Sequence, residues 1–318
     1  MQVLSILRKK RIYSTAFSPS GRYLATPCGD GLLRLWDTFA GEVRQSVPIT
    51  ETSCGYDVTY LDEGRLVFAG TQLSCWKIAV NDWHVISTRL RWARQIDVSP
   101  DKRYLAEVDR ATSTDWGDSG LVVHDTETWQ PVHALTDRTH TTGGLAFSPE
   151  GRLLATGHIV HVGEQHRSAP RLFGGGYTVP QYEYLVRLRE LPSGRVVKLI
   201  DGWQQGVSNL AFSPNGKILA GTAGPRLRVW DLEADREVAL HKRGTKHFQG
   251  VSFTDDGRYL ATVSNDETVR VWDTRSWQEH TTFTWQIGRL LNVAFAADGC
   301  RAAAGSDQGK IVIWDVDG

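Results

Sequence analysis

Short runs in which apolar and charged residues alternate recur along the chain, and they predict β-strands rather than helices. Such runs end in Trp-Asp at Leu33–Asp37, Arg228–Asp231, Val269–Asp273 and Ile311–Asp315. Alternation places successive side chains on opposite faces of a strand, one of them more buried. A second pattern, Phe-Ser-Pro-x-Gly-Arg/Lys, recurs roughly 20 residues earlier, and its Pro and Gly favour a tight turn.

The two patterns repeat in register along the whole chain. Positions equivalent to the Trp of Trp-Asp are separated by 40, 48, 65, 41, 42 and 42 residues; they are Trp36, Trp76, His124, Arg189, Trp230, Trp272 and Trp314. A period of roughly 40–45 residues with Trp-Asp at this point is the signature of WD40 repeats. The chain therefore resembles the WD40 repeat family, with seven units. Two of these units lack the Trp, at His124-Asp125 and Arg189-Glu190.

This resemblance implies an all-β fold, a seven-bladed β-propeller whose blades each contain four strands, in one domain spanning residues 1–318. The last unit, residues 291–318, ends after its third strand. We expect residues 2–7 to supply its fourth strand and so close the ring, which removes unpaired internal edges. Insertions at about 109–118 and 157–182 fall between second and third strands. We expect them to lie on the upper face, the second folding like a lid over the channel mouth.

The chain departs from the family pattern in its buried polar residues. The family carries Gly-His before the first strand and an Asp in the turn between the second and third strands. Here the Asp is present at Asp30 and Asp266, whereas Gly-His is absent. We expect rigidity to depend on sheet packing and on the third-strand Trp side chains.

Composition narrows the function classes. The 36 Lys and Arg balance 36 Asp and Glu, so bulk charge favours neither nucleic acid nor a membrane. The four Cys are scattered without metal-binding spacing, and no apolar run is long enough to span a bilayer. Charges follow the apolar N-terminal stretch instead of preceding it, which argues against a secretory signal. We therefore expect a cytoplasmic protein that is monomeric by itself and does not bind membranes.

Catalytic motifs are absent from the sequence. It has no GxSxG, Walker or HExxH element, and we predict no catalytic residues, no metal and no cofactor. One cluster of potential metal ligands is present: His158, His161, Glu164 and His166 lie together in the second insertion. Imidazole is a common metal ligand, so a metal-assisted hydrolase built on this insertion is a minor alternative.

The best candidate site is the upper face, where the connections between blades carry aromatic and basic residues. The predicted partner-binding residues are Trp92, Trp116, Trp203 and Trp285 as anchors, with Arg91, Arg94, Lys242, Arg243 and Arg289 as cationic selectors. The opposite, lower rim is expected to be acidic. The alternatives are that each Trp packs between blades and that the charges are ordinary solvated surface.

These residues predict a non-catalytic scaffold that binds a protein partner. An acidic or phosphorylated peptide would suit Arg forks and aromatic rings. Single-stranded nucleic acid on the same face is the alternative, since bases stack on aromatic rings.

Overall fold

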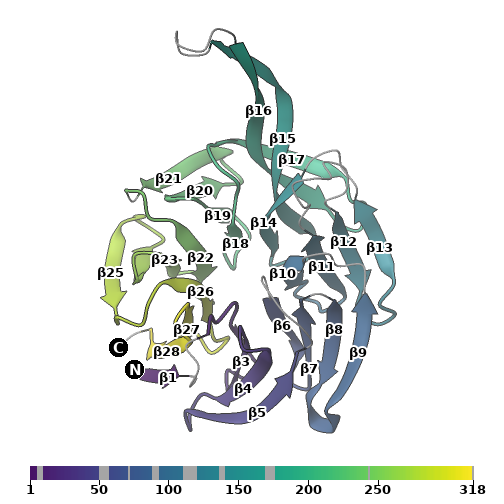
Figure 1. Ribbon diagram of the computed structural model, residues 1–318, viewed down its shortest axis with the longest axis vertical. Helices are drawn as coiled ribbons and strands as arrows, with labels where there is room; N and C mark the ends of the chain where they lie inside the picture. Colours follow the sequence, from purple (N-terminus) through teal and green to yellow (C-terminus); the bar gives the residue numbers. More distant parts are fainter. Residues whose placement is uncertain are drawn as a thin grey trace.

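The computed structural model describes residues 1–5, 10–49, 57–70, 72–87, 93–109, 120–135, 140–168, 176–242 and 244–316. Its strands form seven four-stranded antiparallel sheets set around a central channel (Figure 1). This confirms the predicted seven-bladed propeller. We count the strands of each blade from first to fourth, starting at the channel.

The blades follow one another along the chain. Blades 1 to 3 are β2 (Ala16–Phe17), β3 (Tyr23–Cys28), β4 (Leu32–Asp37) and β5 (Glu42–Pro48); β6 (Asp57–Asp62), β7 (Arg65–Ala69), β8 (Leu73–Lys77) and β9 (Asp82–Ser87); β10 (Ala93–Val98), β11 (Tyr104–Asp109), β12 (Leu121–Asp125) and β13 (Pro131–Leu135). Blades 4 and 5 are β14 (His140–Phe147), β15 (Leu153–Ser168), β16 (Gly176–Glu190) and β17 (Val196–Trp203); β18 (Asn209–Phe212), β19 (Ile218–Ala223), β20 (Arg226–Asp231) and β21 (Arg236–Lys242). Blade 6 is β22 (Phe248–Phe253), β23 (Tyr259–Ser264), β24 (Thr268–Asp273) and β25 (Glu279–Thr284). The 3-10 turn η1 (Ile78–Val80) joins β8 to β9.

Blade 7 is completed by the N-terminal strand, as predicted. It contains β26 (Leu290–Phe295), β27 (Arg301–Ser306) and β28 (Lys310–Asp315), and β1 (Gln2–Ser5) pairs with β28. The two ends of the chain lie side by side in Figure 1. Leu4 of β1 is buried against Ile311 and Ile313, so the closing strand also contributes to the core.

One pair of positions repeats in every blade and fixes the strand register. The Trp-equivalent residue of the third strand faces a small or branched apolar residue of the second strand. The pairs are Leu24–Trp36, Leu66–Trp76, Leu105–His124, Leu154–Arg189, Leu219–Trp230, Leu260–Trp272 and Ala302–Trp314. A slip of one residue would move every side chain of the strand to the opposite face of the blade, so this pairing marks the register even where the Trp is replaced.

Apolar packing replaces the missing Gly-His element. Ile12, Phe248 and Leu290, which precede or begin the first strands of blades 1, 6 and 7, are fully buried. The aspartates at the turns bind arginine instead: Asp30 pairs with Arg34 and Asp266 with Arg270, each at 2.6 Å. The expectation that sheet packing carries the rigidity agrees with this arrangement.

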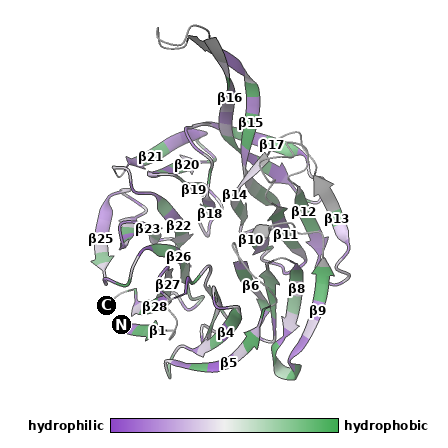
Figure 2. Ribbon diagram, viewed as in Figure 1, coloured by the Kyte–Doolittle hydropathy of each residue, from purple (hydrophilic) through white to green (hydrophobic). Residues whose placement is uncertain are grey.

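The second insertion differs from our expectation. In the described part of this insertion, residues 157–168 and 176–182, β15 and β16 continue as two paired strands from Leu153–Glu190 to Ser168–Gly176, and these strands do not form a lid. The hairpin projects beyond the perimeter of the disc (Figure 1). Hydrophilic and hydrophobic bands alternate along it (Figure 2), and successive side chains of each strand point to opposite faces of the ribbon. The first insertion, residues 109–118, lies almost entirely outside the described residues.

In the part of the chain that the structure describes, no helix combines the length and the apolar character needed to cross a membrane.

Candidate binding site: two faces and a channel

The predicted anchor Trp203 is a packing residue. It ends β17, is 6% exposed, and packs with Ile200, Val207 and Leu210. Its indole N–H donates to the carbonyl of Ile200 at 3.1 Å, and the Arg228 guanidinium lies over its ring at 4.7 Å. Because both the ring and its donor are satisfied internally, the expectation of an exposed anchor here is wrong.

Gly221 explains why Trp203 turns inward. It occupies the position held by Thr26 and Thr262 in blades 1 and 6. A Cβ at Gly221 would lie 2.6 Å from the Trp203 ring, so the absent side chain makes room for the indole. A Gly in place of this Thr is the sequence signal that predicts the inward Trp.

Trp285 is half-buried and belongs to an aromatic stack. Its ring lies 5.3 Å from Phe283 and nearly parallel to it, and 5.0 Å from Trp314. These contacts favour the packing alternative for Trp285, although one part of the ring is exposed.

The predicted cations divide into paired and unpaired groups. Arg289 binds Asp307 through its side chain at 2.8 Å, and its backbone N–H donates to the same carboxylate. Lys242 is exposed at the end of β21 and makes no ion pair with the described residues. Arg91, Trp92, Trp116 and Arg243 lie outside the described residues, and only the backbone of Arg94 is described.

The lower face is not simply acidic. In blades 1, 2, 5 and 7 a cation at or next to the turn between the first and second strands pairs with an acidic side chain; the pairs are Arg22–Asp37, Arg65–Asp62, Lys217–Glu233 and Arg301–Asp298. Sequence reasoning missed this because it treated Phe-Ser-Pro-x-Gly-Arg/Lys only as a turn. The predicted acidic rim is therefore corrected to a rim of mixed charge.

His158 and His161, the two hairpin histidines whose side chains are described, do not belong to a metal site. His158 is buried and its Nε2 lies 2.7 Å from the Thr156 hydroxyl, while burial lowers its pKa to about 3. His161 packs edge-on against Tyr182. Among the described residues, no group of three or more His, Cys, Asp or Glu is placed to hold a metal ion.

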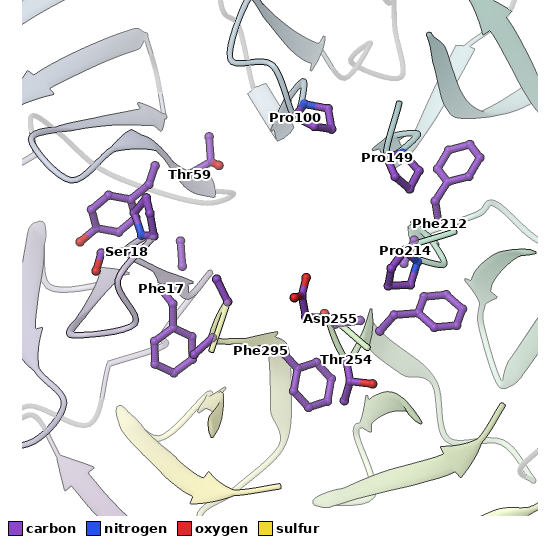
Figure 3. Close-up of a pocket in the computed structure, with 18 of the residues that line it drawn as sticks. Phe17, Ser18, Thr59, Pro100, Pro149, Phe212, Pro214, Thr254, Asp255 and Phe295 are labelled. Atoms are coloured by element: carbon purple, nitrogen blue, oxygen red, sulfur yellow. The ribbon is translucent and has the colours of Figure 1, made fainter. Parts of the chain in front are cut away.

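The central channel contains two adjoining cavities. The lower one, of about 620 Å³, is lined by the repeated Phe-Ser-Pro turns. Figure 3 shows Pro100, Pro149, Pro214 and Asp255 pointing toward the opening, with Phe212 and Phe295 farther back. The other cavity, of about 640 Å³, is lined mainly by polar residues of the first strands and shares Phe17 and Phe295 with the lower one. We call these the apolar half and the polar half of the channel.

Two aspartates hold neighbouring first strands together in the polar half. Asp57 accepts from the Ser14 hydroxyl of blade 1 at 2.6 Å and from the Ile96 N–H of blade 3 at 2.9 Å. Asp97 accepts from the Phe147 N–H of blade 4 at 2.7 Å. Burial raises the pKa of both carboxyl groups, that of Asp97 to about 6, to which the nearby charge of Asp57 contributes.

A ring of this kind, with seven four-stranded blades closed by the first strand of the chain, defines a β-propeller built from sequence repeats. The WD40 family model (WD domain, G-beta repeat) matches residues 2–37, 194–231, 241–273 and 276–315. Together with the seven blades and their Trp-Asp strands, this match shows that the chain belongs to the WD40 repeat family.

Curated relatives match part of the chain. The target of rapamycin complex subunit wat1 of Schizosaccharomyces pombe is 33% identical over 97 residues, which cover 30% of this chain and 31% of that protein. The target of rapamycin complex subunit LST8 of Mus musculus is 25% identical over 138 residues, 42% of each chain. The WD repeat-containing protein VIP3 of Arabidopsis thaliana is 29% identical over 137 residues. The matched region spans less than half the length of each of these relatives.

Proposed function

We propose that this protein is a non-catalytic scaffold that binds a protein partner on the upper face, through an acidic or phosphorylated segment. The supporting observation is a set of exposed cations without an ion pair among the described residues: Lys10, Arg11, Lys242 and Lys246. Lys242 ends β21 and Lys246 lies between β21 and β22, just before blade 6. Lys10 and Arg11 lie between β1 and β2, just after blade 7. We call these four residues the cationic arc. The connection between blades 6 and 7 carries the half-buried Trp285.

Most acidic side chains near the cationic arc form ion pairs with arginines of their own blades. Asp30, Asp266 and Asp307 each bind an arginine of their own blade, at 2.6, 2.6 and 2.8 Å. Glu267 is the described exception. The lysines therefore exceed the acids that remain available, which favours an anionic partner segment.

The relatives support the scaffold role. Two of them are named as subunits of a complex, which fits a propeller that acts by holding other proteins. Propellers of this family offer a wide rigid face, and binding energy at such faces concentrates in a few residues.

The test measures peptide binding by fluorescence anisotropy. Acidic and phosphoserine peptides are compared with neutral peptides of equal length, using the wild type and a Lys242→Glu, Lys246→Glu double variant. We expect the double variant to bind acidic peptides at least about tenfold more weakly, because attraction becomes repulsion. The control is Arg152→Glu, an exposed lower-face residue, which should change affinity less than about twofold.

A single-stranded oligonucleotide provides the competing outcome. If it binds more tightly than any acidic peptide, with affinity falling steeply as salt is added, the face binds nucleic acid and the proposed partner class is wrong. Equal loss in the Arg152→Glu control would also contradict the proposal, since the effect would then be one of overall charge.

A further inference from the structure

The channel carries a negative charge that the balanced composition conceals. Among the described residues that line its two halves, the charged ones are Asp57, Asp97, Asp255 and Lys102. Three carboxylates therefore face one ammonium group inside a narrow space with protein walls. Such walls focus the field of the charges, so a cationic guest is favoured there.

The polar half also contains acceptor oxygens without donors. Thr15, Gln95 and Asn292 line it, and one side-chain oxygen of each is buried with no hydrogen-bond partner in the described part of the chain. Thr15 is only 7% exposed. A buried polar oxygen without a partner is costly, and the Thr15 hydroxyl can donate as well as accept. These three oxygens are covered, whereas the carboxylates of Asp57 and Asp97 line the cavity and only accept hydrogen bonds when ionised. The complementary guest is rich in N–H donors, as Lys and Arg side chains are.

The carboxylates of the polar half are held in fixed positions. Asp57 is held by the Ser14 hydroxyl and the Ile96 N–H, and Asp97 by the N–H groups of Phe147 and Val98. Each carboxylate has about four lone-pair sites, so these bonds orient it without saturating it. A bound cation would therefore contact carboxylates that are already oriented, and binding would not have to order them.

The apolar half suits the methylene stem of a long basic side chain. Phe17, Phe295, Pro100 and Pro214 line it. Lys and Arg bury their stems along such surfaces, and their cationic heads are attracted to aromatic faces.

Asp255 is a departure from the repeat at this mouth. Blades 1, 3, 4 and 5 place a proline at its position, at Pro19, Pro100, Pro149 and Pro214, whereas blade 6 has Thr254-Asp255. Asp255 accepts no hydrogen bond from the described residues, and its carboxylate points into the opening (Figure 3). It therefore adds a charge at the entrance without stabilising its own turn.

We propose that the channel binds a lysine or arginine side chain from an extended segment of a partner protein, entered through the mouth formed by the Phe-Ser-Pro turns. Asp255 attracts the cation at the entrance, the apolar half contacts the stem, and the carboxylates of Asp57 and Asp97 receive the N–H donors. This site is separate from the cationic arc of the upper face and has the opposite charge preference.

The probes are acetylated pentapeptides, Ala-Ala-X-Ala-Ala amide, in which X is arginine, lysine or norleucine, titrated by calorimetry. We expect the arginine or lysine peptide to bind and norleucine to bind at least about tenfold more weakly, because it keeps the stem and lacks the charge. Asp97→Asn and Asp255→Asn should each weaken the basic peptide about tenfold. The matched control is Asp256→Asn, next to Asp255, whose carboxylate instead accepts from Thr254 and the Arg258 N–H outside the channel.

A second readout locates the guest. Binding of a cation beside Asp97 should lower the pKa of its carboxyl from about 6, followed by carbon-13 NMR. If the peptide binds and this pKa does not move, the head lies elsewhere and the proposal is wrong. Should Asp97→Asn fail to fold, Asp255→Asn decides, since Asp255 makes no internal bond that its replacement would break.

Three other results would overturn the proposal. The first is equal binding of the norleucine peptide, and the second is no saturable binding of either basic peptide up to about 10 mM. The third is displacement of the peptide by lower concentrations of spermidine or calcium, which would assign the channel to small cations. The Lys242→Glu, Lys246→Glu variant should bind the basic peptide as well as the wild type, so failure here is distinct from failure of the upper-face proposal.

Discussion

In blades 1 and 6, the third-strand Trp donates from its indole N–H to a buried threonine of the second strand, Trp36 to Thr26 and Trp272 to Thr262, each at 2.9 Å. Blades 3 and 4 place ionisable groups at the Trp position. His124 lies 2.9 Å from buried Glu107, and Arg189 donates to the carbonyl of Gly194 at 3.1 Å. All four blades keep the same strand pairing. The difference teaches that pairing and turns define a blade, whereas the buried residues determine how its stability responds to mutation and pH.

The largest expected loss of stability follows removal of the third-strand Trp from a blade in which that Trp donates to a buried threonine, as in blades 1 and 6. Trp272→Ala removes a fully buried side chain and its hydrogen bond, and should reduce the free energy of unfolding by about 3–5 kcal/mol. Urea unfolding followed by circular dichroism measures it. Trp230→Ala in blade 5 is the comparison, because Trp230 is half-buried and its N–H reaches Asp235 at 3.3 Å near the surface. Equal losses would mean that the blades do not differ as described.

An intermediate effect is expected from breaking the buried pair of blade 3. Glu107→Ala leaves His124 buried without its partner, and should cost about 3 kcal/mol. Grafting the residues of blade 1, as Glu107→Thr with His124→Trp, should recover most of this loss in the same unfolding experiment. A graft that is less stable than Glu107→Ala would show that blade 3 has adapted its packing to the ionisable pair.

The smallest effect is the pH dependence that His158 of blade 4 contributes to stability. Because burial depresses the pKa of His158 to about 3, the unfolded chain takes up a proton at a higher pH than the folded one. Stability is therefore complete above the unfolded pKa of about 6.5 and falls as pH decreases, by about 2 kcal/mol at pH 5. His158→Gln should remove this component between pH 7 and pH 5, while His280→Gln, at an exposed position, should keep it. An unchanged pH profile in His158→Gln would refute the assignment.

The sequence was sufficient for the fold because its signals are local and repeated. Trp-Asp strands, Ser-Pro-x-Gly turns and the short last unit each act within a few residues, so they predicted seven blades and closure by β1. They also predicted core positions for five third-strand Trp residues. Trp36, Trp76, Trp272 and Trp314 are buried, whereas Trp230 is half-buried.

The site was less predictable because its residues come together from distant segments. Asp57, Asp97 and Asp255 belong to three blades, and nothing in their local sequence marks them as channel residues. Trp203 was wrongly expected to be exposed, because its burial depends on the space left by Gly221 in the next blade. The segment 157–182 was expected to be a lid-like loop, because its mixed polarity conceals the alternation of β15 and β16.

The projecting hairpin of β15 and β16 distinguishes blade 4 from the other blades and so breaks the rotational pseudosymmetry of the disc. The seven blades share one backbone pattern, so a partner that contacted only their common features could bind in several rotational positions. A partner that contacts both the face and the hairpin has only one position that satisfies both. The hairpin of blade 4 would then determine which blade contacts which part of such a partner.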